Sequence, residues 1–256
     1  MSLLLVKLTL APLLIWLATL ATRRWGPAIG GWIAAFPLTS GPVSVFLALE
    51  QGREFAAVAA MNSILGIAAV AAFCIVYAKS ARRFSWTIAF PCACVAHFVL
   101  LFILSLTPSI LPLAIALSIA ILGAALLVIG RPDVQPGPVP SPWWDVPLRM
   151  AAAVGVLLLI TGIASYIGPK WSGLISPFPV FVSVLGVFAH VQSGSAAAHQ
   201  LMRGTLIGSF AFVAFFIAVA LTVCDVSLPL VYLLATAVTL AVNVAMLRVV
   251  QGRQGR

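Results

Sequence analysis

Two stretches decide the fold: GPAIGGWIAAFPLTSGPVSVFLALEQGREFAAVAAMNSILG at residues 26–66 and GPKWSGLISPFPVFVSVLGVFAHVQSGSAAAHQLMRGTLIG at residues 168–208. With Gly26 placed over Gly168, the two stretches align without a gap and share eleven identical positions. We call residues that this alignment pairs counterparts, as Phe36-Pro37 is paired with Phe178-Pro179. Similarity at one fixed spacing indicates an internal duplication.

The composition around these stretches is that of a membrane protein. Hydrophobic residues make up 63% of the 256 residues and charged residues only 7%, whereas about a quarter of the residues in a soluble domain are charged. Apolar runs close to the roughly 20 residues that span a bilayer recur along the whole chain. They cover residues 2–22, 27–49, 54–78, 84–105, 109–130, 146–166, 169–191, 197–223 and 227–248. We therefore expect an all-α polytopic membrane protein with about nine transmembrane helices in a lipid bilayer.

The duplication and the number of spans together predict the topology. Spans one to four correspond to spans six to nine, and the fifth span has no counterpart. Because a shift of five spans is odd, the second copy enters the membrane upside down relative to the first. The expected organisation is a first four-helix repeat (1–106), a linker helix with a Pro-rich loop (107–145) and a second, inverted four-helix repeat (146–256). Inverted repeats of this kind build many secondary transporters, with the substrate site near the midplane.

The distribution of basic residues predicts the orientation of the chain. With nine spans, eleven of the fourteen Lys and Arg residues fall on one side: Arg23, Arg24, Lys79, Arg82, Arg83, Arg131, Arg149, Arg203, Arg248, Arg253 and Arg256. Lys7, Arg53 and Lys170 fall on the other. The positive-inside rule then places the C-terminus in the cytoplasm and the N-terminus outside. The same rule accounts for the net charge of +9 without nucleic-acid binding, for which the chain offers no soluble basic face.

The candidate site lies where the two repeats meet. Pro37 and Pro179 fall near the centres of the second and seventh spans, and each removes one backbone hydrogen bond. Paired interruptions at corresponding positions of two halves indicate a transport site, although proline kinks also serve packing alone. The substrate-binding candidates are Phe36, Pro37, Thr39, Ser40, Asn62, Ser176, Phe178, Pro179, Ser183 and Arg203. Their hydroxyl groups have two interpretations: they line a polar cavity, or they repair the interrupted helices.

Two residues are candidates for coupling transport to an ion, and each has a simpler interpretation. Glu50 closes the second span, and no carboxylate lies mid-membrane. His97 suits a proton relay but is most simply a hydrogen-bonded core histidine. A snorkelling role for Arg203 at the cytoplasmic interface is slightly favoured over a role in substrate binding. The basic residues nearest the core favour a small anion over a cation as the solute.

The sequence contains no pattern typical of a metal site, a cofactor site or an enzyme. The four cysteines fall in or at the end of apolar runs, and Cys92-Ala93-Cys94 lacks the two-residue gap of a zinc or redox motif. We therefore expect neither a disulfide, nor a metal, nor a cofactor. An intramembrane enzyme is disfavoured because His, Asp, Glu and Cys form no constellation at helical spacing.

One stretch resembles a known family. The string SGLISPFPVF at residues 172–181, with the Glu50-Gln51-Gly52 turn of the first copy, is similar to the signature region of the GlpM-type small bacterial inner-membrane proteins. Those proteins are about half as long and have about four helices, so the resemblance implies a fused duplicate in the bacterial inner membrane. It implies no activity.

These observations predict a secondary transporter or exporter of a small solute, with an anion favoured, that works by alternating access. The alternative is an integral membrane factor that transports nothing and supports envelope or polysaccharide assembly. Whether the protein forms a homo-oligomer is left open by the sequence.

Overall fold

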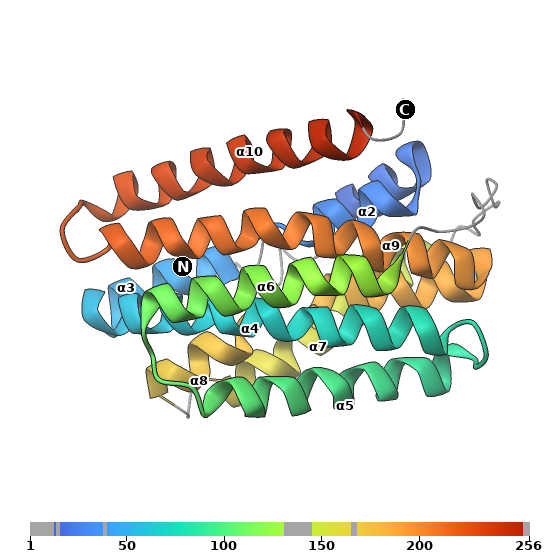
Figure 1. Ribbon diagram of the computed structural model, residues 1–256, viewed down its shortest axis with the longest axis horizontal. Coiled ribbons are helices and arrows are strands. Elements are labelled where there is room, and N and C mark those ends of the chain that lie inside the picture. Colours follow the sequence, from blue (N-terminus) through green and yellow to red (C-terminus); the bar gives the residue numbers. More distant parts are fainter. Residues whose placement is uncertain (1–12, 14–15, 38–39, 131–144, 165–167, 253–256) are drawn as a thin grey trace.

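The computed structural model describes residues 13, 16–37, 40–130, 145–164 and 168–252, and all of its regular structure in these ranges is helical (Figure 1). A helical segment at 16–25 comes first. The helices that follow are α2 (Pro27–Ala34), α3 (Ser40–Glu50), α4 (Arg53–Ser80), α5 (Trp86–Ser105), α6 (Leu111–Ile129), α7 (Asp145–Ala164), α8 (Gly168–Ile175), α9 (Val180–Thr222) and α10 (Leu228–Gly252). The all-helical prediction is confirmed for this part of the chain.

Five helical stretches are long and apolar enough to cross a bilayer, which indicates a membrane-embedded protein. They are α4, α5, α6, the α8–α9 stretch and residues Leu228–Met246 of α10. Most of the α4 window is buried inside the protein, whereas the α5, α6 and α10 windows are mostly exposed. α4 therefore lies at the centre of the bundle, and the other three present apolar faces to their surroundings.

The second predicted span is two short helices separated by a break. α2 ends at Ala34, where the Phe36 amide donates to the carbonyl of Ile33 at 3.0 Å in the shorter 3₁₀ pattern. At the start of α3, the Gly41 amide donates to the carbonyl oxygen of Pro37 at 2.8 Å. Since Pro37 has no amide hydrogen, it cannot continue α2 but can begin α3. The predicted interruption at Pro37 is confirmed.

The seventh predicted span is broken in the same way between α8 and α9. The Phe178 amide donates to the carbonyl of Ile175 at 2.9 Å, and the Ser183 amide donates to the carbonyl of Pro179 at 2.8 Å. All four residues are the counterparts of those that make the two hydrogen bonds of the first break. The interruption at Pro179 is therefore confirmed, with the same hydrogen-bond pattern.

α9 is not one rod, because it folds back on itself at Gly194. Phe181 and Ser209 both line one cavity, although about 42 Å would separate them along a straight helix. Gly194 has φ 79° and ψ −176°, a conformation open essentially to glycine alone. Its counterpart Gly52 has φ 95° and ψ 166° and joins α3 to α4. The predicted seventh span therefore corresponds to α8 and the part of α9 before Gly194. The predicted eighth span corresponds to the part of α9 after Gly194.

Replacing Gly194 with alanine tests the turn. We expect Gly194→Ala to destabilise the protein by about 1–3 kcal/mol, since a Cβ is strained at this φ and ψ. Gly123→Ala in α6 is the matched control: no atom lies within 4 Å of the added Cβ, and alanine is the better helix former by about 1 kcal/mol. The measurement is the thermal unfolding midpoint of each purified variant in detergent. An unchanged midpoint for Gly194→Ala would contradict the turn geometry.

Candidate functional site

The centre of the protein is a crossing in which each broken helix packs against the long helix of the other half of the chain. α2 lies along the second part of α9, and α8 lies along α4. A Cβ on Gly31 would overlap the carbonyl oxygen of Leu201. A Cβ on Gly173 would overlap the carbonyl oxygen of Ala59. The two contacts are reciprocal, because Gly173 is the counterpart of Gly31 and Leu201 is the counterpart of Ala59.

A second pair of contacts repeats this reciprocity about two turns further along α4 and α9. A Cβ on Gly66 in α4 would overlap the carbonyl oxygen of Leu174 in α8. A Cβ on Gly208 in α9 would come within 2.7 Å of the carbonyl oxygen of Trp32 in α2. Glycine at these positions lets two backbones approach closely, as in other membrane helix pairs. Gly204 adds a further contact of this kind, since a Cβ there would overlap the carbonyl oxygen of Ala28 in α2.

Hydroxyl groups supply hydrogen bonds at the same contacts. Ser63 on α4 donates to the carbonyl oxygen of Gly173 at 3.1 Å, and its counterpart Thr205 on α9 donates to that of Gly31 at 3.3 Å. Each hydroxyl also lies 2.9 or 3.0 Å from the carbonyl oxygen four residues earlier in its own helix. A backbone interrupted inside a membrane needs such partners, because hydrocarbon offers none.

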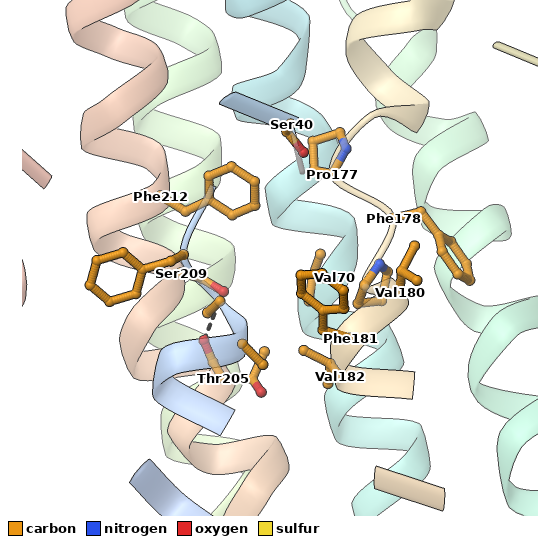
Figure 2. A pocket seen from close by; sticks show the side chains of 14 residues that line it. Ser40, Val70, Pro177, Phe178, Val180, Phe181, Val182, Thr205, Ser209 and Phe212 are labelled. Carbon is orange, nitrogen blue, oxygen red and sulfur yellow. Dashed lines mark hydrogen bonds between the residues drawn. The ribbon is translucent and has the colours of Figure 1, made fainter. Parts of the chain in front are cut away.

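The two breaks meet at a small cavity (Figure 2). The Ser40 hydroxyl at the start of α3 donates to the carbonyl oxygen of Ser176 at 2.9 Å, so it links one break directly to the other. The cavity has a volume of about 20 Å³, which is room for about one water molecule. Its walls are residues 34–36, Ser40, Val70, residues 177–182, Thr205, Ser209 and Phe212.

A larger space, which we call the α10 groove, lies beside the first break. Its volume is about 450 Å³, within the range of small-molecule sites. Phe36, Pro37, Gly41, Pro42, Val45 and Phe46 form one wall. Phe215, Tyr232, Thr236 and Thr239 from α9 and α10 form the other. Phe36 also lines the small cavity, so this side chain separates the two spaces.

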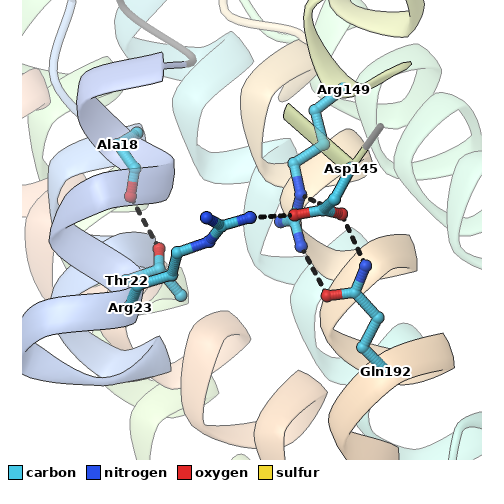
Figure 3. A network of polar contacts seen from close by, with 6 residues as sticks. All are labelled: Ala18, Thr22, Arg23, Asp145, Arg149 and Gln192. Carbon is cyan, nitrogen blue, oxygen red and sulfur yellow. Dashed lines mark hydrogen bonds and ion pairs between the residues drawn. The ribbon is translucent and has the colours of Figure 1, made fainter. Parts of the chain in front are cut away.

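A buried ionic cluster lies apart from the crossing (Figure 3). The Asp145 carboxylate accepts hydrogen bonds from Arg23 at 2.7 Å, from Arg149 at 2.9 Å and from Gln192 at 2.5 Å. Burial raises the pKa of this carboxyl, but the three hydrogen bonds and the charge of Arg149 lower it more, so the pKa lies below its usual range. Arg149 also stacks over the ring of Phe188. The cluster ties the helix at 16–25 to α7 and to the first part of α9.

Most residues predicted for the substrate site lie at the crossing. Phe36, Ser40, Phe178 and Pro179 line the small cavity, and Pro37 lines the α10 groove. Ser176 contributes its carbonyl oxygen to the link with Ser40. The Ser183 hydroxyl donates to the carbonyl oxygen of Pro179 at 2.6 Å, which is the helix-repair role. Thr39 lies outside the described residues.

Asn62 and Arg203 lie apart from these two spaces. The Asn62 side chain donates to Val58 in its own helix at 2.8 Å and accepts from Ser109 at 3.2 Å, so it holds the connection between α5 and α6. Arg203 donates to the carbonyl oxygen of Gly130 at 2.8 Å, at the end of α6. Both side chains therefore brace the start and end of α6 rather than line a cavity.

The two coupling candidates differ in their surroundings. Glu50 is the last residue of α3 and is exposed. His97 is fully buried and packs edge-on against Phe178 with ring centroids 5.2 Å apart. Its polar neighbour is the backbone of Ala69 in α4, although neither ring nitrogen meets a partner in ideal hydrogen-bond geometry. His97 touches the second break, which brings it to the site.

Two features of the site were not predicted from the sequence. The signal for the ionic cluster is the i, i+4 pair of Asp145 and Arg149 at the start of α7. The signal for the α10 groove is the spacing of Tyr232, Thr236 and Thr239, which puts three hydroxyl groups on one face of a helix. Both patterns are short, and neither shows what the face contacts.

The glycine contacts predict a specific sensitivity to added methyl groups. We expect Gly31→Ala and Gly173→Ala each to lower stability by about 1–3 kcal/mol, because the Cβ collides with backbone that cannot rotate away. Gly41→Ala is the matched control, since its Cβ would meet only Phe215 at an ordinary 3.5 Å and Pro37 at 3.9 Å. Thermal unfolding in detergent measures all three. Equal stability of the three variants would contradict the backbone contacts.

Comparisons with known protein families, with curated proteins and with solved structures found no match to this chain. The resemblance to the GlpM-type proteins therefore stays a prediction. What the site does has to be inferred from its own geometry.

Proposed function

We propose that this protein is a secondary transporter or exporter of a small solute, built from two inverted four-helix repeats with nine membrane spans. The observation that carries the proposal is the reciprocal crossing: each broken helix is seated on the long helix of the other half through glycines at equivalent positions of the two copies. Broken helices at the interface of two repeats are the usual setting of a transport site.

Reciprocal contacts are what a two-fold relation between two halves produces. If residue i of one half touches residue j of the other, then the counterpart of i touches the counterpart of j. Gly31 with Leu201 and Gly173 with Ala59 obey this rule. The turn glycines, Gly52 and its counterpart Gly194, both have φ between 79° and 95°. These agreements between contacts and backbone angles support the duplication independently of the eleven identical positions in the alignment.

The directions of the helices support an inverted second repeat. Arg53 at the start of α4 donates to the carbonyl oxygen of Val226 at 2.9 Å, just after the end of α9. α4 and the second part of α9 therefore run in opposite directions, and Figure 1 shows the same opposition between α5 and α10. Equivalent helices that run opposite ways are related by an axis in the membrane plane.

Transport accounts for the broken helices better than packing does. An unbroken helix satisfies its own backbone, whereas each break exposes amides and carbonyls that need protein or water around them. The chain keeps two such breaks and brings them within one hydrogen bond of each other, through Ser40 and Ser176. A water-sized cavity at the centre with a larger groove beside it is the arrangement expected of a closed pathway.

The solute that we propose is small, and alternating access would carry it past the two breaks. The sequence favours an anion as the solute. In both spaces, however, the described lining residues are apolar or hydroxylic, and none of them is charged. The described basic residues lie instead near the helix ends, as in the cluster of Arg23 and Arg149. An anion would gain its selectivity at these ends rather than at the crossing.

Flux through the purified protein tests the proposal. Comparing metabolites inside and outside cells, with and without the protein, identifies the solute, and its uptake into proteoliposomes is then measured. We expect Pro37→Ala and Pro179→Ala each to reduce the flux at least about tenfold, because a continuous helix closes the break. Pro91→Ala is the control, because Pro91 lies in α5 on an exposed face.

Two outcomes would contradict the transport proposal. In the first, wild-type protein inserts correctly and moves none of the candidate solutes. In the second, the two break variants transport as well as the Pro91 control does. Recovery of a partner by crosslinking, together with the absence of flux, would favour the assembly factor instead.

The native cysteines test the proposed inner-membrane orientation. Cys224 is exposed and lies beside Arg53 at the end of the bundle that we propose to face outward. In a variant whose other cysteines (Cys74, Cys92 and Cys94) are alanine, we expect a membrane-impermeant maleimide to label Cys224 in intact cells. Arg82→Cys in a cysteine-free background should be labelled only after lysis. The reverse pattern would place the C-terminus outside.

A further inference from the structure

The α10 groove has hydroxyl groups along one wall of an otherwise apolar space. Tyr232, Thr236 and Thr239 share one face of α10 and border the groove. Rings and aliphatic side chains from α3 and α9 form the remainder, and no charged residue of the described chain lines the groove. A ligand held here would be uncharged, since an unpaired charge in such a site is costly.

The hydrogen bonds that the threonine hydroxyls of this wall already make determine whether a ligand must donate or accept. Thr236 donates its hydroxyl hydrogen to the carbonyl oxygen of Tyr232 at 2.7 Å, and Thr239 donates to that of Ala235 at 2.7 Å. Each hydroxyl has one hydrogen and two lone pairs, so both threonines keep only acceptor capacity toward the groove. A ligand that satisfies them must bring an N–H or O–H donor.

At the second break, larger side chains occupy the equivalent positions among the described residues. His97 and Phe98 are the counterparts of Thr239 and Leu240. Phe178 stacks on Phe98 with ring centroids 5.6 Å apart and meets His97 edge-on at 5.2 Å. At the first break the equivalent ring, Phe36, packs edge-on against Trp32 of α2, with ring centroids 5.4 Å apart.

The position of the groove connects it to the crossing. Phe36 is the wall that the groove shares with the small cavity, and Pro37 and Gly41 at the first break line the groove as well. The Tyr232 and Ser44 hydroxyls, 2.9 Å apart, bridge α10 to α3. A molecule in the groove would therefore touch the break itself and the helix that follows it.

We propose that the α10 groove is the solute-binding site and that it takes a neutral, largely apolar organic molecule with at least one N–H or O–H donor. The inference rests on the proposed transport function and narrows its substrate class. Within the described residues we place this site beside the first break, where α10 carries Thr239 and its counterpart α5 carries the larger ring of His97.

Indole is a suitable probe, since it is neutral, aromatic and carries one N–H donor. Binding of radiolabelled indole to the full chain in nanodiscs is measured against empty nanodiscs, beside 1-methylindole, which has no donor, and indole-3-carboxylate, which is charged. We expect saturable binding of indole with one site per chain. Binding of the other two compounds should be at least about fivefold weaker. 1-Methylindole has no donor for the threonine hydroxyls, and the charge of indole-3-carboxylate would have no partner in the groove.

Two variants locate the binding in the groove. Gly41→Leu fills it from α3 and should reduce indole binding at least about tenfold, with Gly123→Leu in α6 as the matched control, since an added Cβ there meets no atom within 4 Å. Thr239→Val removes one acceptor with little change of shape and should weaken indole about fivefold, which corresponds to one lost hydrogen bond. It should leave the binding of 1-methylindole unchanged.

Three results would overturn the inference: no saturable indole binding, as expected if a lipid chain fills the groove; equal binding of indole and 1-methylindole; or undiminished binding in Gly41→Leu and Thr239→Val. Flux separates this failure from that of the proposed function. If proteoliposomes transport a solute while indole binding fails these criteria, transport stands and the groove assignment falls. If indole binds as described and nothing is transported, the site stands as a ligand site and the transport proposal falls.

Discussion

The structure depends on one constraint: a backbone interrupted within the hydrocarbon region must find its hydrogen-bond partners in protein. Both interruptions meet this requirement by lying against the long helix of the opposite half of the chain, where glycine allows contact from backbone to backbone. At Gly31 and Gly173 even a methyl group would overlap a carbonyl oxygen. The hydroxyls of Ser63 and Thr205 then reach the carbonyls of those same glycines. Without glycine at these positions the breaks would lie too far from any partner to remain inside a membrane.

This exchange of helices between halves also joins the two halves into one body. α2 belongs by sequence to the first half but packs on α9, and α8 belongs to the second but packs on α4. Separating the two halves would expose both breaks at once, so in the transport cycle that we propose the halves would stay in contact. The first break has its weakest packing on the α3 side, where the α10 groove leaves about 450 Å³ unfilled. Movement that requires little loss of packing is therefore expected in α3 rather than at the glycine contacts.

The two breaks were largely predictable from the sequence, because they depend on residues with special backbone properties, whereas the helices that each break packs against were not. Pro37 and Pro179 interrupt a helix wherever they occur in its interior, and Gly52 with its counterpart marks a turn in both copies. The α10 groove was not predictable, because it depends on volumes in three dimensions: its walls come from the first break, α3, α9 and α10, and the Phe36 ring that borders it is held edge-on against Trp32. The role of Asn62 was not apparent for a similar reason, since its partner Ser109 is 47 residues away along the chain.

The two halves share their glycine contacts and the hydrogen bonds of Ser63 and Thr205, but they differ in the polar contacts made by α3, and this difference bears on the proposed function. Ser40 donates to the carbonyl oxygen of Ser176, but the counterpart of Ser40 is Val182, which has no hydroxyl. Ser44, which pairs with Tyr232, corresponds to Gly186. A symmetric dimer of half-length chains would carry either both copies of each contact or neither. As the fused duplicate that we propose, the chain can keep the glycines that the crossing requires and still specialise one break for a ligand, which is consistent with the proposed binding site beside the first break alone.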